Sequence, residues 1–151
     1  MRAIAIRYGM MMFVCLLAYF LLMQWVGLAE NFQLRILNGV IHLAFITVAL
    51  NRYRRDFPDE WNYLSAVATG VITSVVAIAL FAIFQIVYLS LNDDFMAYLQ
   101  ENVNSVGQYL TPVTAALIVL VEGLAVSVIG SYIVMRILNA AADKTSDPPY
   151  K

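Results

Sequence analysis

Long apolar segments alternate with short polar ones along this chain, and four of them are long enough to cross a lipid bilayer. A membrane-spanning helix needs about 20 mostly apolar residues, because the hydrocarbon core is about 30 Å thick and each helical residue rises about 1.5 Å. The predicted spans cover residues 5–28, 34–50, 63–91 and 110–138. The pattern therefore predicts an all-α, polytopic membrane protein with four transmembrane helices in an antiparallel bundle.

The segments outside the spans differ in kind. Residues 29–33 form a short link, which predicts a tight hairpin of the first two spans. Between the third and fourth spans, residues 92–94 offer N-capping side chains, and apolar residues then recur at helical spacing: Phe95, Leu99, Val103, Val106 and Leu110. This predicts a short amphipathic helix in the membrane interface, serving as a lid over the bundle or as a partner-docking surface. The membrane domain covers residues 1–142, and the polar residues 143–151 predict a disordered cytoplasmic tail.

The composition excludes a soluble enzyme, a disordered chain and a nucleic-acid-binding protein. The chain has 151 residues, of which 62% are hydrophobic and 13% charged, whereas soluble domains are about 45–50% apolar and about 25% charged. Nine Lys and Arg against ten Asp and Glu leave no basic surplus for nucleic acid. Cys15 is the one cysteine, so no intrachain disulfide or cysteine-based metal motif can form.

The distribution of Lys and Arg predicts the orientation, because cytoplasmic flanks of membrane spans carry an excess of these residues. Eight of the nine fall on the three segments that four spans place on one side: Arg2, Arg7, Arg52, Arg54, Arg55, Arg136, Lys144 and Lys151. We therefore expect both termini to be cytoplasmic. The first apolar stretch also resembles a secretory signal, but it exceeds the roughly 7–15 residues typical of one, so we interpret it as a retained span.

Small residues predict how the helices pack, because close backbone approach rather than the hydrophobic effect holds membrane helices together. Two stripes have residues spaced by four, one on each of the last two spans: Ala66, Gly70 and Ser74, and Gly123, Ser127 and Ser131. We expect these stripes to form a tight antiparallel pair. Homodimerisation through the same stripes is the alternative.

Glu122 is the strongest candidate for a site inside the membrane. Inserting a charged side chain at the membrane centre costs at least about 2.5–3.5 kcal/mol, so such a residue is expected to have a role. From the rise per residue, the four spans bring several polar side chains to a similar depth: Glu122, His42, Tyr19, and Thr73 or Ser74. These residues predict one intramembrane polar layer, which Asn38 and Gln85 can extend. The layer is either a proton or cation relay, or a structural pair that fixes which helices meet, or a contact of Glu122 with another subunit.

Arg52, Arg54 and Arg55 follow the second span and can meet anionic lipid headgroups. Their simpler interpretation is a positive-inside anchor.

The chain resembles a bacterial family of small four-span membrane proteins known as the domain of unknown function numbered forty-one ninety-nine (DUF4199). The resemblance covers nearly the whole length and lies in Arg7-Tyr8-Gly9, the basic residues 51–55, Ala66 through Ser74, and the segment from Tyr88 to Phe95. It implies a four-helix protein of the bacterial inner membrane, and it carries no activity and no catalytic residues.

Together these patterns predict a non-enzymatic accessory or scaffold protein that packs with itself or with a larger membrane complex. The alternative is a small oligomeric transporter or channel that moves protons or a cation past Glu122 and His42. A third possibility is a lipid-binding or lipid-modifying protein that uses residues 52–55. Because the sequence has no His-rich cluster, phosphate loop or nucleophile motif, we expect no enzymatic activity, cofactor or metal.

Overall fold

The computed structural model describes residues 1–28, 34–102 and 107–146. Its elements follow in the order α1 (Arg2–Val26), α2 (Arg35–Asp56), η2 (Pro58–Glu60), α3 (Tyr63–Leu91), α4 (Asp93–Asn102), η3 (Gly107–Tyr109) and α5 (Pro112–Ser146). Over these ranges the chain forms helices and connections and no strand. The predicted all-α class is confirmed, and so is the short helix between the third and fourth spans.

Four helices, α1, α2, α3 and α5, are long and apolar enough to cross a membrane, as the sequence predicts. The limits of α3 coincide with the predicted span, whereas α2 and α5 continue beyond theirs, to Asp56 and to Ser146. The hydrophobic pattern marks where a helix leaves the apolar layer, not where its hydrogen bonding ends. The first residues of the predicted tail are therefore helical, and residues 147–151 lie outside the described part of the chain.

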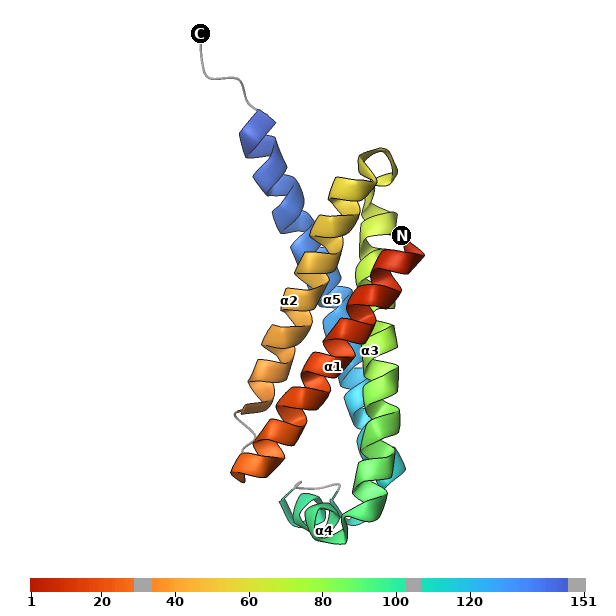
Figure 1. The fold of residues 1–151 in the computed structure, drawn as a ribbon, viewed down its shortest axis with the longest axis vertical. Coiled ribbons are helices and arrows are strands. Elements are labelled where there is room, and N and C mark those ends of the chain that lie inside the picture. Colours follow the sequence, from red (N-terminus) through yellow and green to blue (C-terminus); the bar gives the residue numbers. More distant parts are fainter. Residues whose placement is uncertain (29–33, 103–106, 147–151) are drawn as a thin grey trace.

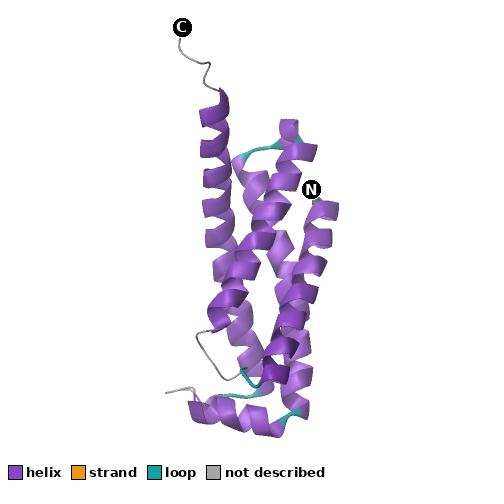
Figure 2. Cartoon of the chain, turned by 60° about the vertical axis from the view of Figure 1, so that its left-hand side comes forward, coloured by secondary structure: helices purple, strands orange, loops and turns teal. Residues whose placement is uncertain are grey.

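Helix α3 is central to the bundle. It packs along α1 on one side and α5 on the other, while α2 contacts all three of the other long helices (Figure 1). The start of α1, the connection between α2 and α3, and the C-terminal half of α5 lie at one end of the molecule. Helix α4 lies across the opposite end, near the end of α1 (Figure 2).

Local sequence signals account for the helix limits. Gly27 ends α1 in the left-handed conformation, with φ of 73°, which a residue with a side chain rarely adopts. Asn62 begins α3 with a capping box, in which its side chain accepts from the Ser65 amide while the Ser65 hydroxyl accepts from the Asn62 amide. Asn92 separates α3 from α4, and its side chain donates to the Tyr88 carbonyl at 2.8 Å. These caps satisfy backbone groups that helix ends leave unpaired.

The two stripes of small residues meet within one chain, between α3 and α5. Ser127 and Ser131 are fully buried. A Cβ atom added to Gly70 would lie 2.8 Å from Cβ of Ser131, and one added to Gly123 would lie 2.7 Å from Cδ1 of Ile78. Gly70 therefore permits an approach to Ser131 that a larger residue would prevent, and a side chain at position 123 would displace Ile78.

A second close contact joins α1 to α3, and the stripes do not predict it. A Cβ atom added to Gly9 would lie 2.6 Å from the carbonyl oxygen of Thr73. The Thr73 side chain is fully buried and donates to the Thr69 carbonyl at 2.8 Å. Thr73 thus belongs to the α1–α3 interface.

Helix α4 closes one end of the bundle. Its Met96 is buried in a cluster with Leu89 of α3, with Leu110 just before α5 and with Ala115 in the first turn of α5. Because Met96 is buried in this cluster, the apolar side of α4 faces the bundle. Of the residues predicted for that side, Val103 and Val106 lie outside the described residues.

Candidate functional site

A cavity of about 830 Å³ lies among the helices near the α4 end of the bundle. Its walls come from the second half of α1, the first half of α2, the second half of α3, the first half of α5, and α4. Ligand cavities in proteins commonly measure about 300–1,000 Å³. The cavity is therefore large enough for a small organic molecule, and most of its wall lies in spans that would be embedded in the membrane.

The α1–α3 side of the cavity is aromatic. Phe20 lines it and makes edge-to-face contacts with four rings of α3 and α4, at centroid distances between 5.0 and 6.4 Å: Phe81, Phe84, Tyr88 and Phe95. Such contacts hold aromatic rings in fixed orientations. This side of the cavity is thus a preformed apolar surface.

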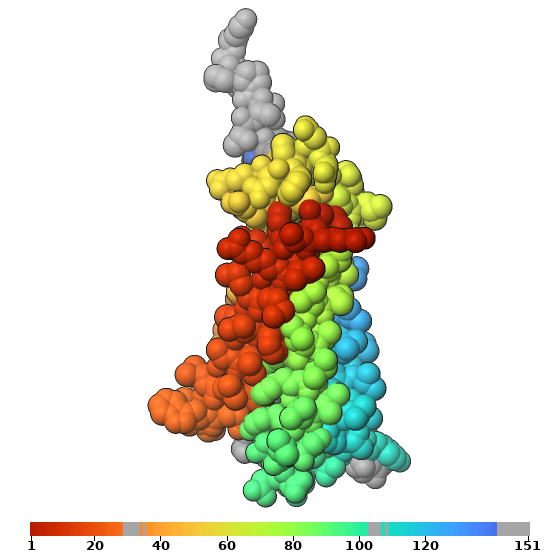
Figure 3. All heavy atoms as spheres, turned by 45° about the vertical axis from the view of Figure 1, so that its right-hand side comes forward, coloured from red at the N-terminus to blue at the C-terminus, as the bar shows by residue number. Residues whose placement is uncertain are grey.

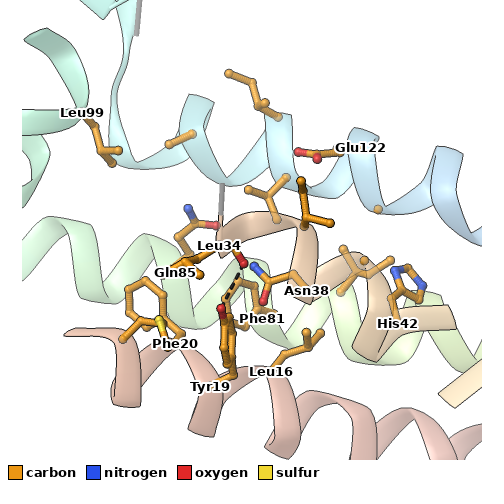
Figure 4. Close-up of a pocket in the computed structure, with 18 of the residues that line it drawn as sticks. Leu16, Tyr19, Phe20, Leu34, Asn38, His42, Phe81, Gln85, Leu99 and Glu122 are labelled. Atoms are coloured by element: carbon orange, nitrogen blue, oxygen red, sulfur yellow. Dashed lines mark hydrogen bonds between the residues drawn. The ribbon is translucent and has the colours of Figure 1, made fainter. Parts of the chain in front are cut away.

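Polar side chains interrupt the apolar wall at several points, and Figure 4 shows their arrangement. Tyr19 of α1 donates a hydrogen bond of 3.0 Å to the carbonyl of Leu34, at the beginning of α2. Asn38 of α2 and Gln85 of α3 also line the cavity. The Gln85 Oε1 atom is buried and has no hydrogen-bond partner among the described residues. A buried acceptor of this kind is rare, because leaving it unpaired is costly.

His42 lies at the deeper end of the cavity and is buried. Its Nε2 atom lies 2.7 Å from the Ser74 hydroxyl, which itself donates to the Gly70 carbonyl at 3.0 Å. This pair connects α2 to α3. Within a membrane such a bond is worth about 1 kcal/mol, so it helps to fix the position of α2.

Glu122 of α5 also lines the cavity, on a different helix from the other polar residues (Figure 4). The structure therefore brings three residues of the predicted layer, Tyr19, His42 and Glu122, to one cavity. Ser74 is connected to it through His42, whereas Thr73 does not line the cavity and its backbone carbonyl lies at the α1–α3 interface. The predicted layer is thus divided between a cavity wall and helix contacts.

Helix α4 supplies wall residues that sequence patterns did not single out, among them Tyr98 and Asn102. A periodic pattern shows that α4 has an apolar face, but it does not show which part of the bundle that face meets. Asn38 and Gln85, by contrast, could be identified from the sequence as candidate site residues, because each is a polar residue in an otherwise apolar helical stretch.

A family model described as "Protein of unknown function (DUF4199)" matches residues 7–139. The chain belongs to this family. The match includes most of the four spans and every residue of the cavity wall. No curated protein and no solved structure is significantly similar to this chain.

In this DUF4199 protein, one arginine of the predicted headgroup-binding edge faces inward. Arg54 Nη1 donates to the Leu138 carbonyl of α5 at 2.6 Å, and its guanidinium carbon lies 5.7 Å from the centre of the Trp61 ring. Trp61 Nε1 in turn donates to Asn139 Oδ1 at 2.9 Å. Arg54 thus ties the end of α2 to α5, and Trp61 ties the α2–α3 connection to α5.

The two neighbouring arginines are more exposed. Arg52 pairs with Asp56 at 2.8 Å across one helical turn, and Arg55 is exposed. Any contact of this edge with lipid headgroups would involve these two residues more than Arg54. Across the described residues, no group of three or more His, Cys, Asp or Glu side chains is placed to hold a metal ion.

Proposed function

We propose that this DUF4199 protein is a non-enzymatic accessory or scaffold protein of the bacterial inner membrane that holds another membrane component in its cavity. The observation that carries the proposal is the cavity itself, which opens among four spanning helices and has both apolar and polar walls. We infer that this cavity opens to the lipid phase, because most of its wall lies in spans that would be embedded in the membrane. Its occupant would therefore be a membrane component and not a water-soluble metabolite.

The contrast with the rest of the bundle supports this proposal. Between α3 and α5 the packing is so close that Gly70 and Gly123 leave no space for a methyl group. At Gly39, by contrast, which lines the cavity, an added Cβ would meet no atom within 4 Å. The wall of the cavity at Gly39 is thus less closely packed than the α3–α5 contact, as expected for a binding site.

The partner surfaces follow from the same packing. The small-residue stripes are used between α3 and α5, so a homo-oligomer or a larger membrane complex would form through other faces of the bundle. Both termini are proposed to be cytoplasmic, since the arginines at the start of α1 and at the end of α2 lie at the same end of the molecule.

Native mass spectrometry tests the proposal on protein extracted gently from its own membrane into lipid nanodiscs. The expected result is a reproducible added mass, from a protein subunit, a lipid or a small molecule, in fixed ratio to the chain. A chain released with no added mass, in several extraction conditions, would contradict the accessory function.

Proton or cation movement is the second candidate, because His42 and Glu122 line the same cavity. In proteoliposomes with a pH gradient, this candidate requires a flux that Glu122→Gln abolishes and that Glu101→Gln leaves unchanged. Glu101 is an exposed carboxylate on α4 outside the cavity wall, so it controls for a general change of charge. Equal flux in wild-type protein and empty vesicles excludes the candidate.

A further inference from the structure

We propose that one hydrocarbon chain of a bilayer lipid occupies the cavity, an inference that rests on the proposed function and specifies the membrane component. The lipid comes from the leaflet at the α4 end of the bundle, because the cavity lies near that end. Three features of the cavity support this occupant: the interactions that its polar side chains already make, its length along the helices, and the unfavourable alternative of an empty space.

Several polar side chains of the wall have partners within the protein. Tyr19 donates to the Leu34 carbonyl, and His42 pairs with the Ser74 hydroxyl. The side-chain amide of Asn102 donates at 2.9 Å to a backbone carbonyl of its own helix. These interactions use much of the hydrogen-bonding capacity of the wall, so they leave little for the head group of a ligand.

The other polar residues of the wall do not define a site for a polar molecule. The Gln85 Oε1 atom is buried beneath the surface of the wall, so a molecule in the cavity cannot reach it. Glu122 has an interaction of its own within the protein. Asn38 adds a neutral amide, and most of the remaining lining residues are aliphatic or aromatic. A polar occupant would lose its hydrogen bonds against such a wall, whereas a hydrocarbon chain has none to lose.

The length of the cavity matches one leaflet of the membrane. Its lining residues run from Ala115 to Val126 on α5 and from Leu16 to Met23 on α1. At about 1.5 Å per residue, these stretches rise about 16 Å and about 10 Å along the helices. Half of a hydrocarbon core of about 30 Å is about 15 Å. A lipid chain that enters from the α4 end and lies along the helices therefore has a suitable length.

An empty cavity of about 830 Å³ would be unfavourable, because its wall loses dispersion contacts and the loss increases with volume. Water is a poor filling, since a buried water needs about two to four polar partners. Lipid chains, by contrast, surround the spans. In Figure 3 the end of α1 (orange) stands away from α3 and α4 (green), and we place the entrance of the chain on this side.

Photolabelling tests this inference on the full-length protein in lipid nanodiscs. The probe is a phosphatidylcholine with a diazirine at the end of one acyl chain, and mass spectrometry of peptides locates the label. Leu16 and Ile78 both line the cavity and are only 7% and 5% exposed, so lipid outside the bundle has little access to them. We expect label at both residues in the wild-type protein.

Two substitutions provide a comparison within the protein. Gly39→Phe places a ring in the open space beside Gly39 and is expected to remove most of the label at Leu16 and Ile78. Its control is Ala44→Phe, at an exposed position of the same helix outside the cavity wall, which is expected to label like wild type. Label at Ile83, an exposed α3 residue outside the wall, is expected to stay the same in all three proteins.

Probes with different head groups distinguish recognition of the chain from recognition of a head group. A methyl ester and an amine carry the same labelled chain as the phosphatidylcholine. The ratio of label at Leu16 to label at Ile83 is expected to be the same for the three probes. A higher ratio for the amine means that the cavity selects a cation, which overturns the inference.

Two other results also overturn it. Label confined to Ile83 and other lipid-facing residues in wild type means that no chain enters the cavity. Label at Leu16 and Ile78 that persists in folded Gly39→Phe means that it does not arise from the cavity. If native mass spectrometry finds a bound protein or small molecule while no probe labels Leu16 and Ile78, the accessory function stands and only the lipid chain fails.

Discussion

The close contact between α3 and α5 allows the loss of stability caused by Gly70→Ala to be estimated. The added Cβ would lie 2.8 Å from Cβ of Ser131 and 3.1 Å from Cδ1 of Leu50, and it would lie still closer to the Ser131 hydroxyl. Carbon atoms in contact prefer about 3.5–4.0 Å. The two helices must therefore separate locally, and Leu50 at the α2 side must move as well.

Overpacking of this kind typically costs about 1–3 kcal/mol. For a chain of this length, each kcal/mol shifts the unfolding temperature by roughly 2–4 °C, so we expect Gly70→Ala to lower it by about 2–12 °C. Circular dichroism of the protein in a mild detergent measures this shift. Gly39→Ala is the matched control, because its added Cβ meets no atom within 4 Å, and it is expected to have no destabilising effect.

The double variant Gly70→Ala/Ser131→Gly tests whether the close contact with Ser131 causes the loss of stability. The Ser131 hydroxyl is buried without a hydrogen-bond partner among the described residues, so Ser131→Gly breaks no hydrogen bond. In Gly70→Ala/Ser131→Gly the methyl group has space, and most of the lost stability should return, with a coupling energy of at least about 0.5 kcal/mol. If Gly70→Ala is tolerated like Gly39→Ala, or if Ser131→Gly rescues nothing, α3 and α5 do not pack as described.

Two further substitutions test other helix contacts by the same unfolding measurement. Ser74→Ala removes the hydroxyl at 2.7 Å from His42 Nε2, and we expect a loss of about 1 kcal/mol; a loss that persists unchanged when His42 is first replaced by Phe would contradict the pairing. Arg54→Ala removes the bond to the Leu138 carbonyl and the contact with Trp61, so it should destabilise the protein more than Arg55→Ala at the neighbouring exposed position. Equal effects of the two arginine substitutions would show that Arg54 does not tie the end of α2 to α5.

The sequence predicts the number and type of the helices well, for a physical reason. Lipid solvates no backbone polar group, so a long apolar segment has few alternatives to a spanning helix. The capping residues Asn62 and Asn92 and the left-handed Gly27 also mark boundaries that local chemistry determines. The extension of α5 to Ser146 was not predictable from hydropathy, because a polar helix can continue outside the membrane.

The cavity was only partly predictable. Depth along each span can be calculated from the rise per residue. Tyr19, His42 and Glu122, which this calculation places at a similar depth, all line the cavity. Depth does not determine the rotation of a helix about its axis, however. Thr73 has a suitable depth but does not line the cavity, and its backbone carbonyl lies against Gly9 of α1. The apolar remainder of the wall, such as Phe20, looks in sequence like any lipid-facing or packed residue.

The most direct test of the central claim, that the cavity holds a membrane component, compares native masses of three proteins taken from their own membrane: wild type, Gly39→Phe and Ala44→Phe. Wild type and Ala44→Phe are expected to carry the same added mass, and Gly39→Phe is expected to lose it while retaining its fold by circular dichroism. An added mass that is unchanged in folded Gly39→Phe, or absent from all three proteins, would contradict the claim.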